Sequence, residues 1–259
     1  MRGSVFYEPR TETMQFIFII AAGRSGSTAL QSLLNSNSNV LIRGENNNFF
    51  YETFAVYQSL QKQNKSDERD HPWFGFEHFV PEQYAKMVRN LGRKYLLGDH
   101  SRQTIKKLGF KEIRLFNLFN SQGIYSRKSF LMRKKVEPKT ELIAYIKYIK
   151  HLFPNSKTIF LHRNPREIAE SGWWKDRSIY DLEILCKDLK SFQDEFENIA
   201  QPGHDLCIDY QLLRSQDMKS IRKSIHEPLG LKFNRRQAKK VLTQKLNHGQ
   251  WKHIITKNL

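Results

Sequence analysis

One segment constrains the fold more than any other, because an apolar strand-like run stops at a glycine and then restarts as a helix. Residues 16–22 are apolar throughout, and residues 23–28 read GRSGST. Glycines permit a tight turn, and the first N–H groups of the following helix have no partner within it and point outward at the positive end of its dipole. A strand, a glycine turn and a helix in this order form a pocket for a phosphate or sulfate group.

Two common phosphate-binding motifs do not fit this turn. The nucleotide loop GxxxxGK, followed by Ser or Thr, needs a lysine after its second glycine, whereas Ser27 follows Gly26 here. The dinucleotide fingerprint GxGxxG needs three glycines, and this turn contains only Gly23 and Gly26. The sequence therefore disfavours an ATPase and a dehydrogenase.

Apolar runs rich in β-branched and aromatic residues alternate with helix-like segments along the chain. We expect strands at 15–21, 39–42, 109–113, 157–162 and 205–208. We expect helices at 26–35, 138–152, 165–174, 179–200 and 234–247. This alternation predicts an α/β fold in which helices flank a central parallel sheet and a nucleotide binds at the carboxyl ends of the strands. The 259 residues suffice for one such domain, which we expect to span 1–259.

Two stretches between the expected strands are less regular. We interpret 52–104 and 115–137 as insertions that form the acceptor side of the site or a lid, with a short helix that starts at Pro81. The aromatic residues of the first stretch either line an acceptor pocket or anchor the core, which is their commoner use. The basic cluster at 127–135 is a lid, a site for an anionic acceptor or a solvated loop.

The GRSGST turn resembles the 5′-phosphosulfate loop of the sulfotransferases that use 3′-phosphoadenosine 5′-phosphosulfate (PAPS). Residues 157–171 resemble the 3′-phosphate motif of the same family. In this chain the segment is an apolar strand that ends in a basic turn, after which Pro165 starts a helix. In that family an arginine at the strand end and a serine eight residues later hold the 3′-phosphate, and Arg163 and Ser171 have these positions. The spacing places Ser171 about two helical turns beyond Arg163.

Three more segments resemble tyrosylprotein and carbohydrate sulfotransferases, and they follow in the expected order. VLIRGE ends at Glu45 and resembles the segment that carries the general base. LGFKEIR resembles an internal strand that ends in Lys-acid-x-Arg, with Lys111 in the place of the lysine. CIDYQLL resembles a late Tyr-Glu-Asp-Leu segment with Tyr210 in place, but Gln211 and a leucine replace the two acids.

The resemblance implies a PAPS-dependent sulfotransferase with a P-loop-like core and no metal. It implies in-line transfer of a sulfuryl group from PAPS to a hydroxyl or amine of a small molecule, such as a natural product, or of a saccharide, and release of adenosine 3′,5′-bisphosphate. Glu45 is then the general base, and Lys111 and Arg24 balance the charge that develops on the sulfuryl and bridging oxygens. The residues implied to bind the donor are Gly23, Arg24, Ser25, Gly26, Ser27, Thr28, Arg163, Ser171 and Tyr210.

Several of these residues also have an ordinary structural interpretation. Glu45 could cap a helix or pair with a cation, and Lys111 could pair with the adjacent Glu112. His162 is more typical of a packed or hydrogen-bonded histidine than of a base. Trp173 and Trp174 could stack on adenine, although packing of the helix that carries them is the commoner role.

The charge balance leaves two other functions open. The chain has 43 Lys and Arg residues against 26 Asp and Glu residues, a formal net charge of +17 that attracts polyanions. The alternatives are an ATP-dependent small-molecule kinase and a basic, non-enzymatic nucleic-acid-binding protein. The missing GK pair counts against the first, and the lack of zinc-finger spacing or an RNP-type aromatic strand counts against the second. We therefore expect no nucleic-acid partner.

Cysteine usage and hydropathy indicate a cytoplasmic protein without a membrane anchor. The two cysteines, Cys186 and Cys207, lie far apart and lack the spacing of a zinc site or a disulfide framework. The apolar run 16–22 is shorter than the ~20 residues that span a bilayer, and it leads directly into the glycine turn, which disfavours a signal peptide. The oligomeric state, the acceptor and the native status of 1–13 stay open.

Overall fold

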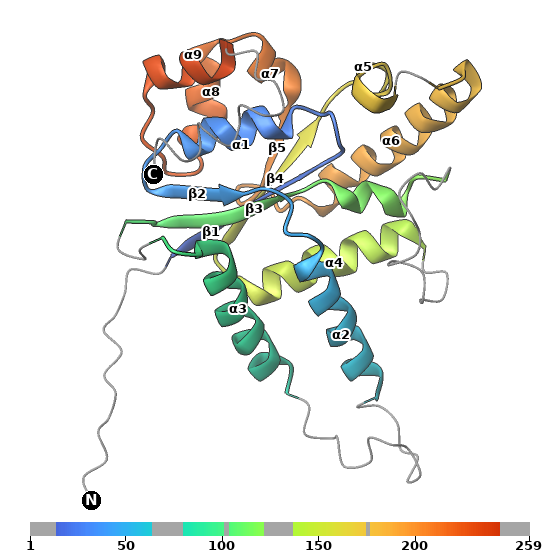
Figure 1. Ribbon diagram of the computed structural model, residues 1–259, viewed down its shortest axis with the longest axis vertical. Coiled ribbons are helices and arrows are strands. Elements are labelled where there is room, and N and C mark those ends of the chain that lie inside the picture. Colours follow the sequence, from blue (N-terminus) through green and yellow to red (C-terminus); the bar gives the residue numbers. More distant parts are fainter. Residues whose placement is uncertain (1–13, 64–79, 101–103, 122–136, 175–176, 244–259) are drawn as a thin grey trace, which may run out of the picture.

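The computed structural model describes residues 14–63, 80–100, 104–121, 137–174 and 177–243. In these residues, five parallel strands form one sheet in the order β2-β3-β1-β4-β5 (Figure 1). The strands are β1 (Gln15–Ala21), β2 (Val40–Arg43), β3 (Lys107–Glu112), β4 (Ser156–His162) and β5 (Leu206–Asp209). The predicted parallel α/β sheet is confirmed, and each predicted strand end lies within two residues of the observed one.

Helices cover both faces of the sheet (Figure 1). One face carries α1 (Ser27–Asn35), α7 (Tyr210–Arg214), α8 (Met218–Ile221) and α9 (Arg235–Thr243). The other carries α2 (Phe49–Gln63), α3 (Pro81–Leu97), α4 (Pro138–Leu152) and α6 (Ile179–Ile199). Along β1, Phe16 and Phe18 pack on the face covered by α2, α3, α4 and α6, while Ile17 and Ile19 pack on the face covered by α1, α7, α8 and α9. Side chains on both faces of this strand are therefore buried. No helix within the described ranges is both long and apolar enough to cross a bilayer.

Two long helices occupy much of the stretch that the sequence left irregular. α2 and α3 pack against each other and against α4, and the Tyr84 hydroxyl donates to the Thr53 carbonyl at 2.6 Å. The helix predicted to start at Pro81 does start there, but the expected short length was wrong, because α3 has 17 residues whose buried positions recur every three or four residues. Phe54 of α2 is buried, which agrees with the aromatic residues of this stretch as core anchors. Residues 64–79 and the basic cluster at 127–135 lie outside the described residues.

The connection after β4 differs from the predicted helix at 165–174. α5 covers only Pro165–Ala169, and a short 3-10 helix follows at Gly172–Trp174. Gly172 has a φ of +62°, which interrupts an α-helix and which residues other than glycine rarely adopt. Ser171 therefore does not lie two turns along a continuous helix from Arg163. The predicted helical spacing of these two residues was wrong.

The strand order brings the carboxyl ends of β1 and β4 side by side. The two strands pair in parallel from Phe16 opposite Ser156 to Ala21 opposite Leu161. From β1 the chain crosses one face through α1, whereas from β4 it crosses the other face through α6 (Figure 1). Neighbouring strands whose connections leave in opposite directions form a crevice at their carboxyl ends, where open α/β sheets bind ligands. The glycine turn after β1 and the basic turn after β4 meet at this crevice.

Candidate active site

The glycine turn after β1 has the geometry of an anion cradle at the start of α1. Gly26 is the N-cap residue with a φ of 92°, and its carbonyl accepts from the Ala29 N–H at 2.9 Å. Because glycine has no side chain to cap the first N–H groups of α1, these groups stay available to an anion. Ser25 is fully buried, and within the described residues its hydroxyl has no hydrogen-bond partner. A buried hydroxyl of this kind is costly unless a ligand or water satisfies it, which fits a bound phosphate oxygen.

The basic turn after β4 contacts the glycine turn directly. Arg163 Nη1 donates to the main-chain carbonyl of Arg24 at 2.8 Å, although the two residues are 139 positions apart. The side chain of Arg24 packs on Gly172, the residue after Ser171, since a Cβ placed on Gly172 would lie 2.5 Å from Arg24 Nε. Arg24 has a φ of 67°, which is uncommon for a residue other than glycine. The structure thus brings the glycine turn, Arg163 and the turn that holds Ser171 together.

Tyr210 contacts both turns. A Cβ placed on Gly26 would lie 2.2 Å from a ring carbon of Tyr210, so the ring packs directly on the N-cap of α1. The guanidinium carbon of Arg163 lies 4.6 Å from the centroid of the same ring, a cation–π distance. Ser171 is turned toward its own chain, since its hydroxyl donates to the Ile168 carbonyl at 2.8 Å. Direct binding of a nucleotide by Ser171 and Tyr210 stays a prediction.

A carboxylate fixes the orientation of Arg163. Glu167 Oε2 accepts from Arg163 Nε at 3.1 Å, and Gln193 accepts from the Arg163 backbone N–H at 3.2 Å. Glu167 Oε1 also accepts from Gln211 at 3.3 Å and lies 3.3 Å from Arg214 Nη1. The segment that residues 207–213 resemble has an acid at the position of Gln211. A carboxylate there would be repelled by Glu167, whereas the amide of Gln211 donates to it.

Lys111 connects the glycine turn to Glu45. The lysine is 7% exposed and lies near the end of β3, where its Nζ is 3.4 Å from Glu45 Oε1 and donates to Thr28 Oγ1 at 3.2 Å. Arg114 Nε lies 3.9 Å from the other carboxylate oxygen of Glu45. Lys111 pairs with Glu45 rather than with Glu112, because consecutive residues of a strand point to opposite faces. Glu45, Lys111 and Thr28 therefore form one cluster beside the cradle.

Glu112 is a buried acid that was not predicted as a site residue. It is 2% exposed, and burial raises its pKa from 4.5 to about 7 although the Arg114 backbone N–H donates to it at 2.8 Å. Asn46 Nδ2 donates to its other oxygen at 3.4 Å, and Asn46 Oδ1 accepts from the Phe50 N–H at 3.3 Å. Glu112 thus ties β3 to the loop that carries Glu45. The position of this acid at the last residue of a largely buried strand was the available signal in the sequence.

His162 and Trp174 belong to the packed interior. Burial lowers the pKa of His162, and its ring lies edge-on to Phe196 at 5.0 Å. Trp174 is 1% exposed, and its ring lies edge-on to Phe116 at 6.2 Å. Trp174 is too buried for a nucleotide base to stack on its ring, and the contacts of both residues agree with the packing interpretation.

The chain matches the model of one protein family, described as the sulfotransferase family, over residues 16–235, from β1 to the first residue of α9. Two solved structures are similar. One is the sulfotransferase domain from the Synechococcus PCC 7002 olefin synthase, with 14% identity over 96% of each chain and a TM-score of 0.48. The other is the sulfotransferase domain from the curacin biosynthetic pathway, with 15% identity over 91% of this chain and 80% of that chain and a TM-score of 0.47. No curated protein matches the chain.

Proposed function

This chain belongs to the sulfotransferase family, and we propose that it moves a sulfuryl group from PAPS to a hydroxyl or amine of a small molecule or saccharide. One observation supports PAPS as the sulfuryl donor. The guanidinium of Arg163 contacts the Arg24 carbonyl at 2.8 Å, so two cationic turns from distant parts of the sequence face one crevice. A nucleotide with a phosphate on both sides of its ribose offers one anionic group to each turn.

Separate parts of the crevice hold the two phosphate groups in this proposal. The N–H groups at the start of α1 and the hydroxyls of Ser25, Ser27 and Thr28 bind the 5′-phosphate. The buried Ser25 hydroxyl, which lacks a partner among the described residues, supports this assignment. Arg163 and Ser171 bind the 3′-phosphate, with Glu167 holding the guanidinium in place.

Glu45 is the proposed general base. Its carboxylate takes the proton of the acceptor hydroxyl or amine as the acceptor oxygen or nitrogen bonds to sulfur. PAPS supplies the sulfuryl group and leaves as adenosine 3′,5′-bisphosphate, which retains the bridging oxygen and its electron pair. Lys111 and Arg24 stabilise the negative charge that develops on the sulfuryl and bridging oxygens. Lys111 suits this role because its buried ammonium lies between the carboxylate of Glu45 and the hydroxyl of Thr28.

Calorimetry with adenosine 3′,5′-bisphosphate tests the choice of donor. We expect the bisphosphate to bind without magnesium and more tightly than AMP or ATP. A preference for ATP with magnesium would instead support the small-molecule kinase. Tight binding of DNA or RNA with a steep salt dependence, and no preference for this nucleotide, would support the nucleic-acid-binding protein.

A further inference from the structure

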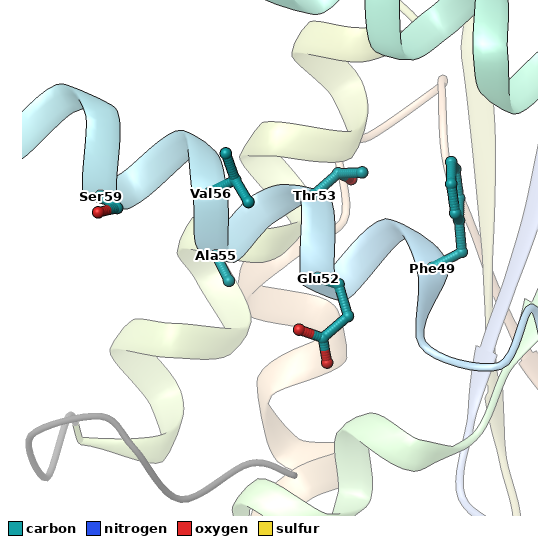
Figure 2. A pocket seen from close by; sticks show the side chains of 6 residues that line it. All are labelled: Phe49, Glu52, Thr53, Ala55, Val56 and Ser59. Carbon is teal, nitrogen blue, oxygen red and sulfur yellow. The ribbon is translucent and has the colours of Figure 1, made fainter.

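A hollow of about 400 Å³ opens along α2, the helix that begins four residues after Glu45 (Figure 2). Its lining residues are Phe49, Glu52, Thr53, Ala55, Val56 and Ser59. Figure 2 shows Phe49 where α2 begins and Ser59 at the far end of the row. Small-molecule sites in proteins commonly have volumes of about 300–1,000 Å³, so the hollow is large enough for one.

Short contacts connect the near end of the hollow to the loop of the proposed base. The carbonyl of Asn46, the residue after Glu45, accepts from the Phe49 N–H at 3.0 Å. The ring of Phe49 lies 4.9 Å from that of Tyr95, and the Tyr95 hydroxyl donates to the same Asn46 carbonyl at 3.4 Å. Phe49 and Glu45 are therefore fixed to one short loop. The near end of the hollow, at Phe49, is thus joined to Glu45 through this loop.

The lining is mainly apolar. Phe49, Ala55 and Val56 contribute hydrocarbon surface, and Val56 is 50% exposed. The Thr53 hydroxyl already donates to the Phe50 carbonyl at 2.8 Å, which leaves its methyl group for contact with a ligand. Among the lining residues that the structure describes, Glu52 alone is charged, and its charge is negative. Such a wall suits an apolar body and disfavours a sulfated or carboxylated glycan, although the whole chain is basic.

Apolar side chains continue from the hollow onto α3. Met87, Leu91 and Tyr95 are exposed and follow one another at intervals of four residues, so they lie on one face of the helix. Tyr95 joins this face to Phe49. Exposed apolar surface is typical of binding sites, and the Tyr95 end of this face contacts the hollow at Phe49.

We propose that this hollow is the acceptor site and that it takes an uncharged or cationic alcohol, phenol or amine with an alkyl or aryl body. The body packs on Phe49 and Val56, and the reacting hydroxyl or amine faces Glu45. This inference rests on the proposed sulfuryl transfer and narrows its acceptor from small molecules and saccharides to a small molecule with an apolar body. A saccharide presents hydroxyls on most of its surface, and an apolar wall leaves them without partners.

The proposal can be tested by binding to the protein loaded with adenosine 3′,5′-bisphosphate. Calorimetry would compare phenol, 4-propylphenol, 4-heptylphenol and the saccharide chitotetraose. We expect affinity to rise at least about 10-fold from phenol to 4-heptylphenol, because each buried methylene strengthens binding by roughly fourfold. Chitotetraose should bind more weakly than 4-heptylphenol.

A substitution at Val56 locates the binding. Val56→Asp should weaken 4-heptylphenol binding at least about 10-fold, since it puts a carboxylate against the alkyl chain, and should leave bisphosphate affinity unchanged. Ile179→Asp is the matched control, because Ile179 is a 73% exposed aliphatic residue on α6, and it should change neither affinity. Val56 is half exposed, so its replacement should not unfold α2, and retained bisphosphate binding checks this.

Three results would overturn the acceptor site: equal affinities for the three phenols, tighter binding of chitotetraose, or full 4-heptylphenol affinity in Val56→Asp. Failure of the unaltered protein to bind adenosine 3′,5′-bisphosphate would instead contradict the proposed function. The two failures are therefore distinguishable in one set of titrations.

Discussion

Arg163 donates a hydrogen bond to the main-chain carbonyl of Arg24 at 2.8 Å, across 139 positions of sequence. The contact holds the basic turn after β4 against the glycine turn after β1. Glu167 pairs with Arg163 at 3.1 Å and keeps its guanidinium oriented. The guanidinium is thus already oriented in the crevice, so we expect less ordering when an anion binds there.

Arg163→Ala should weaken adenosine 3′,5′-bisphosphate binding by about 10- to 100-fold, because a hydrogen bond to a charged group contributes about 1.5–3 kcal/mol. AMP lacks the 3′-phosphate and should lose much less, as calorimetry can measure. Arg166→Ala is the control, since Arg166 is exposed on α5 and pairs with Glu170. Equal losses for the bisphosphate and AMP would refute Arg163 as the partner of the 3′-phosphate.

Glu45→Gln should lower kcat for sulfuryl transfer by roughly 100- to 10,000-fold, the range that a general base contributes. Bisphosphate affinity should stay close to that of the unaltered protein, because Glu45 contacts Lys111 and not the glycine turn. Radiolabelled sulfate transfer measures the first quantity and calorimetry the second. Glu170→Gln is the control, because Glu170 is an exposed carboxylate, and it should leave kcat unchanged. Turnover near the unaltered level in Glu45→Gln would remove Glu45 from the role.

Glu112→Gln should change how stability depends on pH. Burial raises the pKa of Glu112 to about 7 from 4.5, so the folded protein binds a proton that the unfolded chain releases between these values. Its contribution to stability is thus present below pH 4.5 and is lost as the pH rises through 7. The glutamine variant does not titrate, so it should gain stability relative to the unaltered protein from pH 5 to pH 8, by at most about 3 kcal/mol.

Urea unfolding of both proteins at several pH values checks this prediction, and the contributions of other titrating groups cancel in the difference. A difference in unfolding free energy that stays constant from pH 5 to pH 8 would contradict it.

Gly26→Ala should destabilise the protein in two ways. Its φ of 92° is strained for alanine, and the new Cβ would lie 2.2 Å from the ring of Tyr210. Gly203→Ala separates the two effects, because Gly203 has a φ of 73° but no atom within 4 Å of the new Cβ. We expect a loss of about 1–2 kcal/mol for Gly203→Ala and about 1–3 kcal/mol more for Gly26→Ala in urea unfolding.

Tyr210→Ala in the Gly26→Ala background should recover part of that additional loss, because it removes the ring that meets the new methyl group. Equal destabilisation by the two single substitutions would show that the Tyr210 ring does not pack on Gly26.

The strands were predictable because their signal is local. β1 is buried on both faces, so it is a continuous apolar run that ends where the turn at Gly23 begins, and the apolar part of β4 likewise ends just before Arg163. Between 49 and 97 the prediction was incomplete, since α2 was missed and α3 was expected to be short, and both helices pack on each other and on α4. The break at Gly172 was missed because the residues before it suit a helix, whereas its positive φ belongs to a turn that packs on Arg24.

The sequence by itself determined the parallel α/β sheet, the glycine turn and the residue types at each strand end, because hydrophobic periodicity and turn chemistry act between near neighbours. Only the tertiary structure decided which of these side chains meet. It places Arg163 against Arg24, Lys111 between Glu45 and Thr28, and Glu112 beneath the loop of Glu45. These contacts depend on the strand order β2-β3-β1-β4-β5, which sets the neighbours of each strand end and which local sequence patterns do not encode.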